Sequence, residues 1–163
     1  MRRRTLGKTG IEIPELCLGT WGLSGDAYGV VEETEQDQVI ERALALGVTA
    51  FETADTYAKG AMESRLGRLL EKHPDAVVIT KVGTDRSATP PAKRFDDEYL
   101  RGAIEKSRER LKRKIDVLLL HNPSKVALDN DKTRELLEKL VKDGVIRAWG
   151  VSAGNSQVAT AAI

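Results

Sequence analysis

The sequence predicts an α/β fold of the (β/α)8-barrel type, in which residues 1–163 form a single, incomplete barrel domain with about the first five βα units. Strand-like and helix-like segments alternate five times in succession, a pattern typical of a parallel sheet with right-handed crossovers. The strand-like segments are nearly continuous apolar runs, as expected where both faces of a sheet are covered.

A doubly wound sheet is the competing architecture. Such a sheet usually carries a phosphate-binding G-x-G-x-x-G after its first strand. Here the first strand is followed by GTWGLSG, which lacks that spacing. The barrel is therefore preferred, and because a complete barrel needs eight units and typically ~250 residues, the chain resembles the front part of one.

The expected strands are apolar runs bounded by turn residues. They cover residues 4–6, 11–13, 16–20, 48–54, 76–83, 115–122 and 146–152. The first two form a hairpin around the turn GKTG, which precedes the barrel. The other five are the parallel barrel strands.

The expected helices are defined by apolar residues at helical spacing and by capping signals. They cover about 34–46, 62–72, 96–111, 132–142 and a segment from 156 onward. Thr34 and Asp37 resemble a capping box, and Gly47 is expected just past the end of the same helix. Pro74 and Gly144 stop two later helices. The buried face of the third helix is expected to contain Leu100, Ile104, Ser107 and Leu111.

Composition argues against several classes of protein. A net charge of +1 gives no broad electrostatic case for nucleic acid or membrane partners. The opening MRRR is not followed by the apolar stretch of a signal peptide, and no segment is long enough to span a bilayer. Cys17, the one cysteine, cannot form an internal disulfide, which fits a reducing cytoplasm. Its place in an apolar run predicts that it is packed.

Polar side chains lie at the carboxyl ends of the expected strands, where ligands meet parallel sheets of this kind. They are Thr20, Trp21, Glu52, Asp55, Tyr57, Lys81, His121, Asn122, Ser152 and Asn155. Strand alternation places Glu52, Lys81 and His121 on inward faces of three strands, so these side chains should converge. An inward glutamate and an inward lysine should pair, because a buried unpaired charge is costly.

Such a cluster is suited to carbonyl reduction. Tyr57 would be the general acid, because a nearby ammonium favours the phenolate and lowers the tyrosine pKa from its usual ~10. Glu52 would hold Lys81, and His121 would donate a hydrogen bond to the substrate carbonyl. The hydride must come from a cofactor, since no side chain supplies one. Structural interpretations stand beside these roles: a packed tyrosine, a core histidine and a structural Glu52–Lys81 ion pair.

Several segments, in this order, resemble the aldo-keto reductases. GKTGIEIPELCLGTWG is similar to the family's opening hairpin and first strand. GVTAFETADTYAKGAMESRLGRLL resembles its second strand and helix, usually written with F-D-T-A before the tyrosine. VVITKVG, IDVLLLHNP and VIRAWGVS resemble its third, fourth and fifth strands. The resemblance covers almost the whole chain and implies a TIM barrel, closed at its bottom by the hairpin, that reversibly reduces aldehydes and ketones with NAD(P)H.

The resemblance also implies residue roles. The family tetrad of Asp, Tyr, Lys and His matches Glu52, Tyr57, Lys81 and His121. Cofactor contacts are implied for Gly19, Thr20, Trp21 and Ser152, and substrate contacts for Trp21 and His121. NADPH is the expected cofactor, with NADH as the alternative, and no metal is expected.

Three departures from the family pattern bear on activity. Glu52 stands in place of an aspartate and adds one methylene, and overpacking typically costs ~1–3 kcal/mol. Ala153 follows the serine of the fifth strand, where the family usually has asparagine, and Asn155 is a candidate replacement. The chain stops before strands six to eight, which in the family carry most contacts to the adenosine and its 2′-phosphate.

The length leaves three interpretations open. We prefer a truncated piece of a longer reductase, working with its missing C-terminal half. The second is a half-barrel that pairs with a second copy of itself. The third is a catalytically impaired fragment that acts as a nucleotide-binding or interaction module. In each case we expect a cytoplasmic protein that binds a small carbonyl compound or a nucleotide, and no nucleic acid or membrane.

Overall fold

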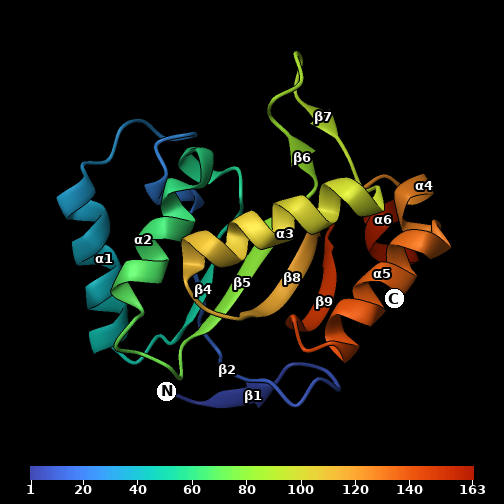
Figure 1. Ribbon diagram of the computed structural model, residues 1–163. Helices are drawn as coiled ribbons and strands as arrows, with labels where there is room; N and C mark the ends of the chain where they lie inside the picture. The colour runs from blue at the N-terminus through green and yellow to red at the C-terminus, as the bar shows by residue number, and fades with distance from the viewer.

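A computed structural model describes all residues, 1–163, and has a parallel sheet at its centre (Figure 1). The sheet consists of β3 (Leu18–Gly19), β4 (Ala50–Glu52), β5 (Val77–Val82), β8 (Ile115–His121) and β9 (Ile146–Ser152). These strands lie side by side in chain order, β3-β4-β5-β8-β9. This order lacks the reversal of a doubly wound sheet, so the prediction of a partial barrel is confirmed.

A hairpin lies beneath the amino ends of the sheet strands (Figure 1). Its strands, β1 (Arg3–Thr5) and β2 (Glu12–Pro14), pair antiparallel as predicted, one residue away from the expected bounds. Ile11 is fully buried and packs on inward-facing residues of four strands. Those residues are Ala50, Val77, Val117 and Ala148. The hairpin therefore closes the end of the barrel opposite to the carboxyl ends of the strands.

The two faces of the sheet carry different side chains, as strand alternation predicts. Ala50 lines the inner face, whereas Phe51 belongs to the larger core of 19 buried residues beneath the helices. Val78 and Leu118 join Phe51 on the outer face. Glu52 follows Ala50 by two residues and therefore shares its inner face.

Helices cover the outer face of the sheet (Figure 1). They are α1 (Glu33–Ala45), α2 (Ala61–Leu69), α3 (Asp97–Leu111) and α5 (Asp131–Lys142), followed by α6 (Ser156–Ala161). In α3 the predicted residues are buried, and Asp96 caps the helix by accepting the Tyr99 N–H at 3.1 Å. No helix combines the length and the apolar character needed to cross a membrane.

The predicted capping box at Thr34 is wrong. The helix begins at Glu33, so Thr34 lies inside it, and its N-cap residue, Glu32, makes no capping hydrogen bond with its side chain. Asp37 instead forms ion pairs with Arg65 and Arg68 of α2. The carboxylate thus joins two helices rather than capping its own.

Helices α2 and α3 approach each other closely at Gly67. A Cβ on Gly67 would lie 2.4 Å from the main-chain oxygen of Arg110 and 2.7 Å from that of Leu111. Only a residue without a side chain allows this distance. The contact fixes α3 against α2, and so fixes Arg110 beside the residues that follow β4.

Several short elements were not predicted. They are the strands β6 (Thr84–Asp85) and β7 (Ala92–Lys93), the helix α4 (Lys125–Leu128) and the 3-10 turns at Trp21–Leu23 and Tyr57–Gly60. Each is too short to show a periodic pattern. The β6–β7 hairpin stands at the carboxyl ends of the sheet strands (Figure 1).

Cys17 is exposed, against the prediction that it is packed. The residue lies next to β3, which pairs with β4 on one side only. A strand at the edge of a sheet gives its side chains neighbours from one direction, and Leu16 beside Cys17 is exposed for the same reason.

Candidate active site

The predicted site residues meet at the carboxyl end of the sheet. Glu52 ends β4, Lys81 lies near the end of β5, and His121 ends β8. These strands are adjacent and parallel, so their ends share one edge of the sheet. Tyr57 follows β4 in a short turn and reaches the same edge.

Lys81 is the centre of the cluster. Its side chain is buried, and Nζ donates hydrogen bonds to Tyr57 Oη at 2.8 Å and to the main-chain oxygen of Thr53 at 3.0 Å. Nζ also forms an ion pair with Glu52. A phenol oxygen, a carbonyl and a carboxylate therefore surround this ammonium, as a buried positive charge requires.

His121 also lies next to Tyr57. The two ring centroids are 6.2 Å apart, and the rings meet edge to face at 85°. Burial lowers the pKa of His121 to about 4, and the positive charges of Lys93 and Lys81 contribute. The imidazole is therefore neutral near pH 7 and carries one ring N–H. Nδ1 is buried without a hydrogen-bond partner.

The pKa of Tyr57 departs from the expected direction. Burial raises it above the ordinary value, and the negative charge of Asp26 adds to the rise. The expectation that the Lys81 ammonium lowers this pKa is therefore wrong, because the largest effect on it is the loss of solvent around the phenol. The consequence is a phenol that keeps its proton at neutral pH and can donate it.

Burial also lowers the pKa of Lys81 to about 8. Lys81 therefore remains mostly protonated at neutral pH, but it loses its charge at a lower pH than an exposed lysine. An ammonium 2.8 Å from Tyr57 Oη would stabilise the phenolate left after proton donation. The pair can thus donate a proton and bear the resulting charge.

An unusual turn holds Tyr57. Ala58 and Lys59 have left-handed backbone angles, with φ of 46° and 55°, and Gly60 follows with φ of 90°. Asp26, from the loop after β3, accepts the Ala58 N–H at 2.8 Å and so supports this strained backbone. Asp26 was not predicted as part of the site, because it lies 32 residues from Ala58 along the chain.

A buried polar network supports the site from outside the barrel. Glu63 of α2 is fully buried and accepts a hydrogen bond from Thr80 Oγ1 at 2.6 Å. Arg110 of α3 donates to the same carboxylate from Nε at 2.7 Å and lies against Gly60. Thr80 directly precedes Lys81, so this network ties the lysine strand to the turn after Tyr57. This network could have been suspected from the sequence, because Glu63 is a charged residue on the apolar face of its helix.

The residues implied for cofactor contact lie along the same rim. Gly19 pairs in register with Glu52, and Ser152 pairs with His121. Thr20 is fully buried, and its Oγ1 has no hydrogen-bond partner. Trp21 is 46% exposed and meets Tyr28 edge to face at 5.5 Å.

Asn155 and Asp55 lie near the same strand ends and have local environments of their own. Asn155 Oδ1 accepts the Val158 N–H at 2.9 Å as the N-cap of α6, so this oxygen is engaged within the helix. Asp55 is partly buried, with Oδ1 unpartnered. Burial and the charge of Glu63 raise the pKa of Asp55 to about 7.

Comparison with known proteins gives a consistent result. A model of the Aldo/keto reductase family matches residues 15–162. The chain is 31% identical over 157 residues to the uncharacterized oxidoreductase YqkF of Bacillus subtilis (strain 168), a match covering 94% of this chain and 49% of that protein. It is also 31% identical over 179 residues to D-threo-aldose 1-dehydrogenase of Pseudomonas sp, covering 94% of this chain and 54% of the relative.

The structural comparison agrees. The holo form of an aldo-keto reductase from Bacillus halodurans matches with a TM-score of 0.86 at 29% identity, over 98% of this chain and 53% of that protein. The chain thus spans about half the length of the relatives it matches.

Proposed function

Because this chain belongs to the aldo-keto reductase family, we propose that it carries the acid–base site of an oxidoreductase that reduces aldehydes and ketones with NAD(P)H. The observation that supports this most directly is the 2.8 Å hydrogen bond from Lys81 Nζ to Tyr57 Oη, with Glu52 paired to the same ammonium. If Glu52 and Lys81 formed only a structural ion pair, the additional hydrogen bond between Lys81 and the Tyr57 hydroxyl would have no role.

The rim of the sheet suits a nicotinamide cofactor. Thr20 Oγ1 and His121 Nδ1 are buried polar atoms without protein partners. Gly19, Thr20, Trp21 and Ser152 are the residues that we assign to the nicotinamide end of the cofactor. The cofactor would supply the hydride that adds to the carbonyl carbon of the substrate. NADPH is preferred over NADH on family resemblance.

The side chains of this chain supply the rest of the reaction. The neutral His121 donates a ring N–H to the substrate oxygen and orients the carbonyl. Tyr57 gives its proton to that oxygen as negative charge develops there. Lys81 then stabilises the phenolate, and Glu52 holds Lys81 within reach. Trp21, exposed at the rim, is assigned to the substrate pocket together with His121.

The test is NAD(P)H oxidation by the full chain with a panel of aldehydes. Tyr57→Phe removes the donated proton and should reduce kcat by at least ~100-fold, within the usual range for general acid catalysis. The same variant should bind NADPH with unchanged affinity, measured by fluorescence titration. Cofactor binding without turnover in the unmodified chain would favour a nucleotide-binding module, and the absence of both would contradict the proposal.

We expect full activity to depend on the remainder of a barrel, supplied by further residues or by a second copy. Denaturing and native mass spectrometry of the active sample separate these cases. A denatured mass of 17.9 kDa with a native mass of twice that value supports a self-paired half-barrel. A larger denatured mass, or a second polypeptide, supports a longer reductase.

A further inference from the structure

The peptide bond that follows His121 is held from two sides. Its carbonyl oxygen, on His121, accepts a hydrogen bond from Lys93 Nζ at 2.7 Å. Its N–H, on Asn122, donates to the main-chain oxygen of Ser152 at 2.9 Å. Asn122 has a left-handed φ of 52°, a conformation that asparagine adopts more readily than most residues other than glycine. The orientation of this peptide unit determines where the Cα–Cβ bond of His121 points.

We propose that Lys93 is a positioning residue for His121: by binding the His121 carbonyl oxygen, it fixes the imidazole in the orientation from which it can donate to a substrate carbonyl. This inference rests on the proposed reductase function for its catalytic meaning. Without Lys93, only the hydrogen bond to Ser152 would hold this peptide unit, and the His121 carbonyl oxygen would lose its Lys93 partner. Rotation about the His121 backbone would then move the imidazole ring.

Lys93 comes from the unpredicted β6–β7 hairpin, and the hairpin holds it firmly. Lys93 pairs in register with Thr84, and Nζ donates to Thr84 Oγ1 at 2.7 Å as well as to His121. Phe95 packs against Gly83 so closely that a Cβ there would lie 2.2 Å from the ring. Thr133 Oγ1 of α5 donates to the Phe95 carbonyl at 3.0 Å. The base of the hairpin is therefore anchored to the helices.

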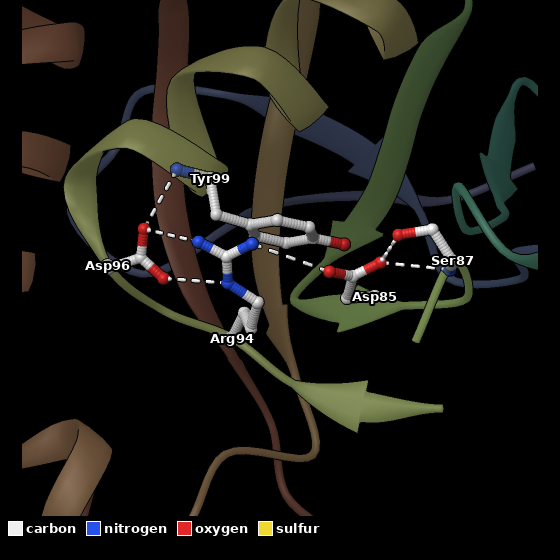
Figure 2. Close-up of polar contacts among 5 residues, drawn as sticks. All are labelled: Asp85, Ser87, Arg94, Asp96 and Tyr99. Atoms are coloured by element: carbon white, nitrogen blue, oxygen red, sulfur yellow. Dashed lines mark hydrogen bonds and ion pairs between the residues drawn. The ribbon is translucent and has the colours of Figure 1, made fainter. Parts of the chain in front are cut away.

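A second set of contacts anchors the next residue, Arg94. Figure 2 shows its guanidinium between Asp96 and Asp85, beside the ring of Tyr99. Nε and Nη2 donate to the two oxygens of Asp96 at 3.0 and 3.1 Å, and Nη1 reaches Asp85 at 3.4 Å. The guanidinium carbon lies 5.0 Å from the Tyr99 ring centroid. These contacts join the hairpin to the start of α3 and leave Lys93 pointing to β8.

The charge of Lys93 has a second consequence for the imidazole. The groups that face His121 are Lys93 of β7, Lys81 of β5 with its partner Glu52, and Tyr57. Both lysines disfavour the imidazolium and so add to the effect of burial on the pKa of His121. Lys93 therefore supports a neutral ring in addition to holding its main chain.

Three lysine variants test the proposal. Lys93→Met removes the donor but keeps the chain length, and Lys93→Arg retains a cationic donor. Lys106→Met, on an exposed lysine of α3, is the matched control. Lys93 is itself exposed, so its variants should fold, which far-UV circular dichroism and thermal melting verify.

The first measurement does not need turnover. The chain has two histidines, and the exposed His73 serves as an internal reference for the NMR signals of His121. Lys93→Met should weaken the NOE contacts between the His121 and Tyr57 rings and raise the pKa of His121. The NMR signals of His73 should be the same as in the unmodified chain. Lys93→Arg and Lys106→Met should preserve both. Unchanged ring contacts in Lys93→Met would overturn the proposal, even with a raised pKa, since Lys93 would then act through charge alone.

The second measurement is steady-state kinetics. Lys93→Met should lower kcat about tenfold with little change in KM, and Lys93→Arg should restore most of it. A loss in Lys93→Met that Lys93→Arg does not restore would also count against positioning by a hydrogen bond. If the unmodified chain neither binds cofactor nor turns over, the proposed function fails, and the NMR experiment still decides the role of Lys93.

Discussion

Gly19 lies opposite Glu52 across the first pair of barrel strands, and a Cβ on Gly19 would approach Glu52 Oε2 to 3.4 Å. The glutamate is one methylene longer than the aspartate of the family pattern, and this contact would be an ordinary van der Waals distance. Glu52 still pairs with Lys81. The longer carboxylate therefore reaches Lys81 from the neighbouring strand.

Glu52→Asp should therefore lower turnover, by about tenfold, because the shorter side chain withdraws its carboxylate from Lys81. The measurement is kcat of both forms with one aldehyde at saturating NADPH. A higher kcat for Glu52→Asp would identify the glutamate as a compromise.

The rate of carbonyl reduction should fall as the pH rises through about 8. The pKa of Lys81 lies near this value, and the neutral amine no longer stabilises the phenolate of Tyr57. His121, with a pKa of about 4, should contribute no change between pH 5 and 7. The test is the pH dependence of kcat/KM in one mixed buffer. In Lys81→Met the rate should be lower at every pH, and the fall in rate above about pH 8 should disappear. If the fall persists in this variant, another group causes it.

The two helical glycines of α2 and α3 should respond oppositely to alanine. Gly67→Ala places a Cβ 2.4 Å from the Arg110 oxygen and should destabilise the fold by at least ~1–3 kcal/mol. Gly102→Ala meets nothing within 4 Å and should stabilise it by roughly 0.5–1 kcal/mol, since alanine is the better helix former. Urea unfolding followed by circular dichroism measures both, and equal effects would contradict the close helix contact.

Asp55 should reduce stability as the pH rises from about 4 to about 7. Its pKa is raised to about 7 by burial and Glu63, whereas the unfolded value is near ~3.9. The folded state therefore binds more protons across this window, and the free energy of unfolding falls with increasing pH. Asp55→Asn removes this pH dependence. The difference in free energy of unfolding between the variant and the unmodified chain should therefore shift in favour of the variant, by up to a few kcal/mol, between pH 4 and pH 7. Parallel pH profiles for the two forms would show that Asp55 titrates normally.

The regular parts of the fold were predictable because their signals are local. The buried face of α3, at Leu100, Ile104, Ser107 and Leu111, was read from spacing alone and matches the structure. Strand alternation likewise identified the inward faces of β4, β5 and β8. The failures were at Thr34, where a capping pattern competed with ion pairs between helices, and at Cys17, whose exposure depends on its place at the sheet edge.

The order of the βα units is predictable from periodicity along the chain. The same periodicity identifies the polar residues that reach the carboxyl end of the sheet. How these residues interact is visible only in the folded protein. The Lys81–Tyr57 hydrogen bond, the raised pKa of Tyr57 and the contact of Lys93 with His121 depend on burial and on distances between separate segments. Desolvation and cross-strand geometry are properties of the packed chain, and no local pattern encodes them.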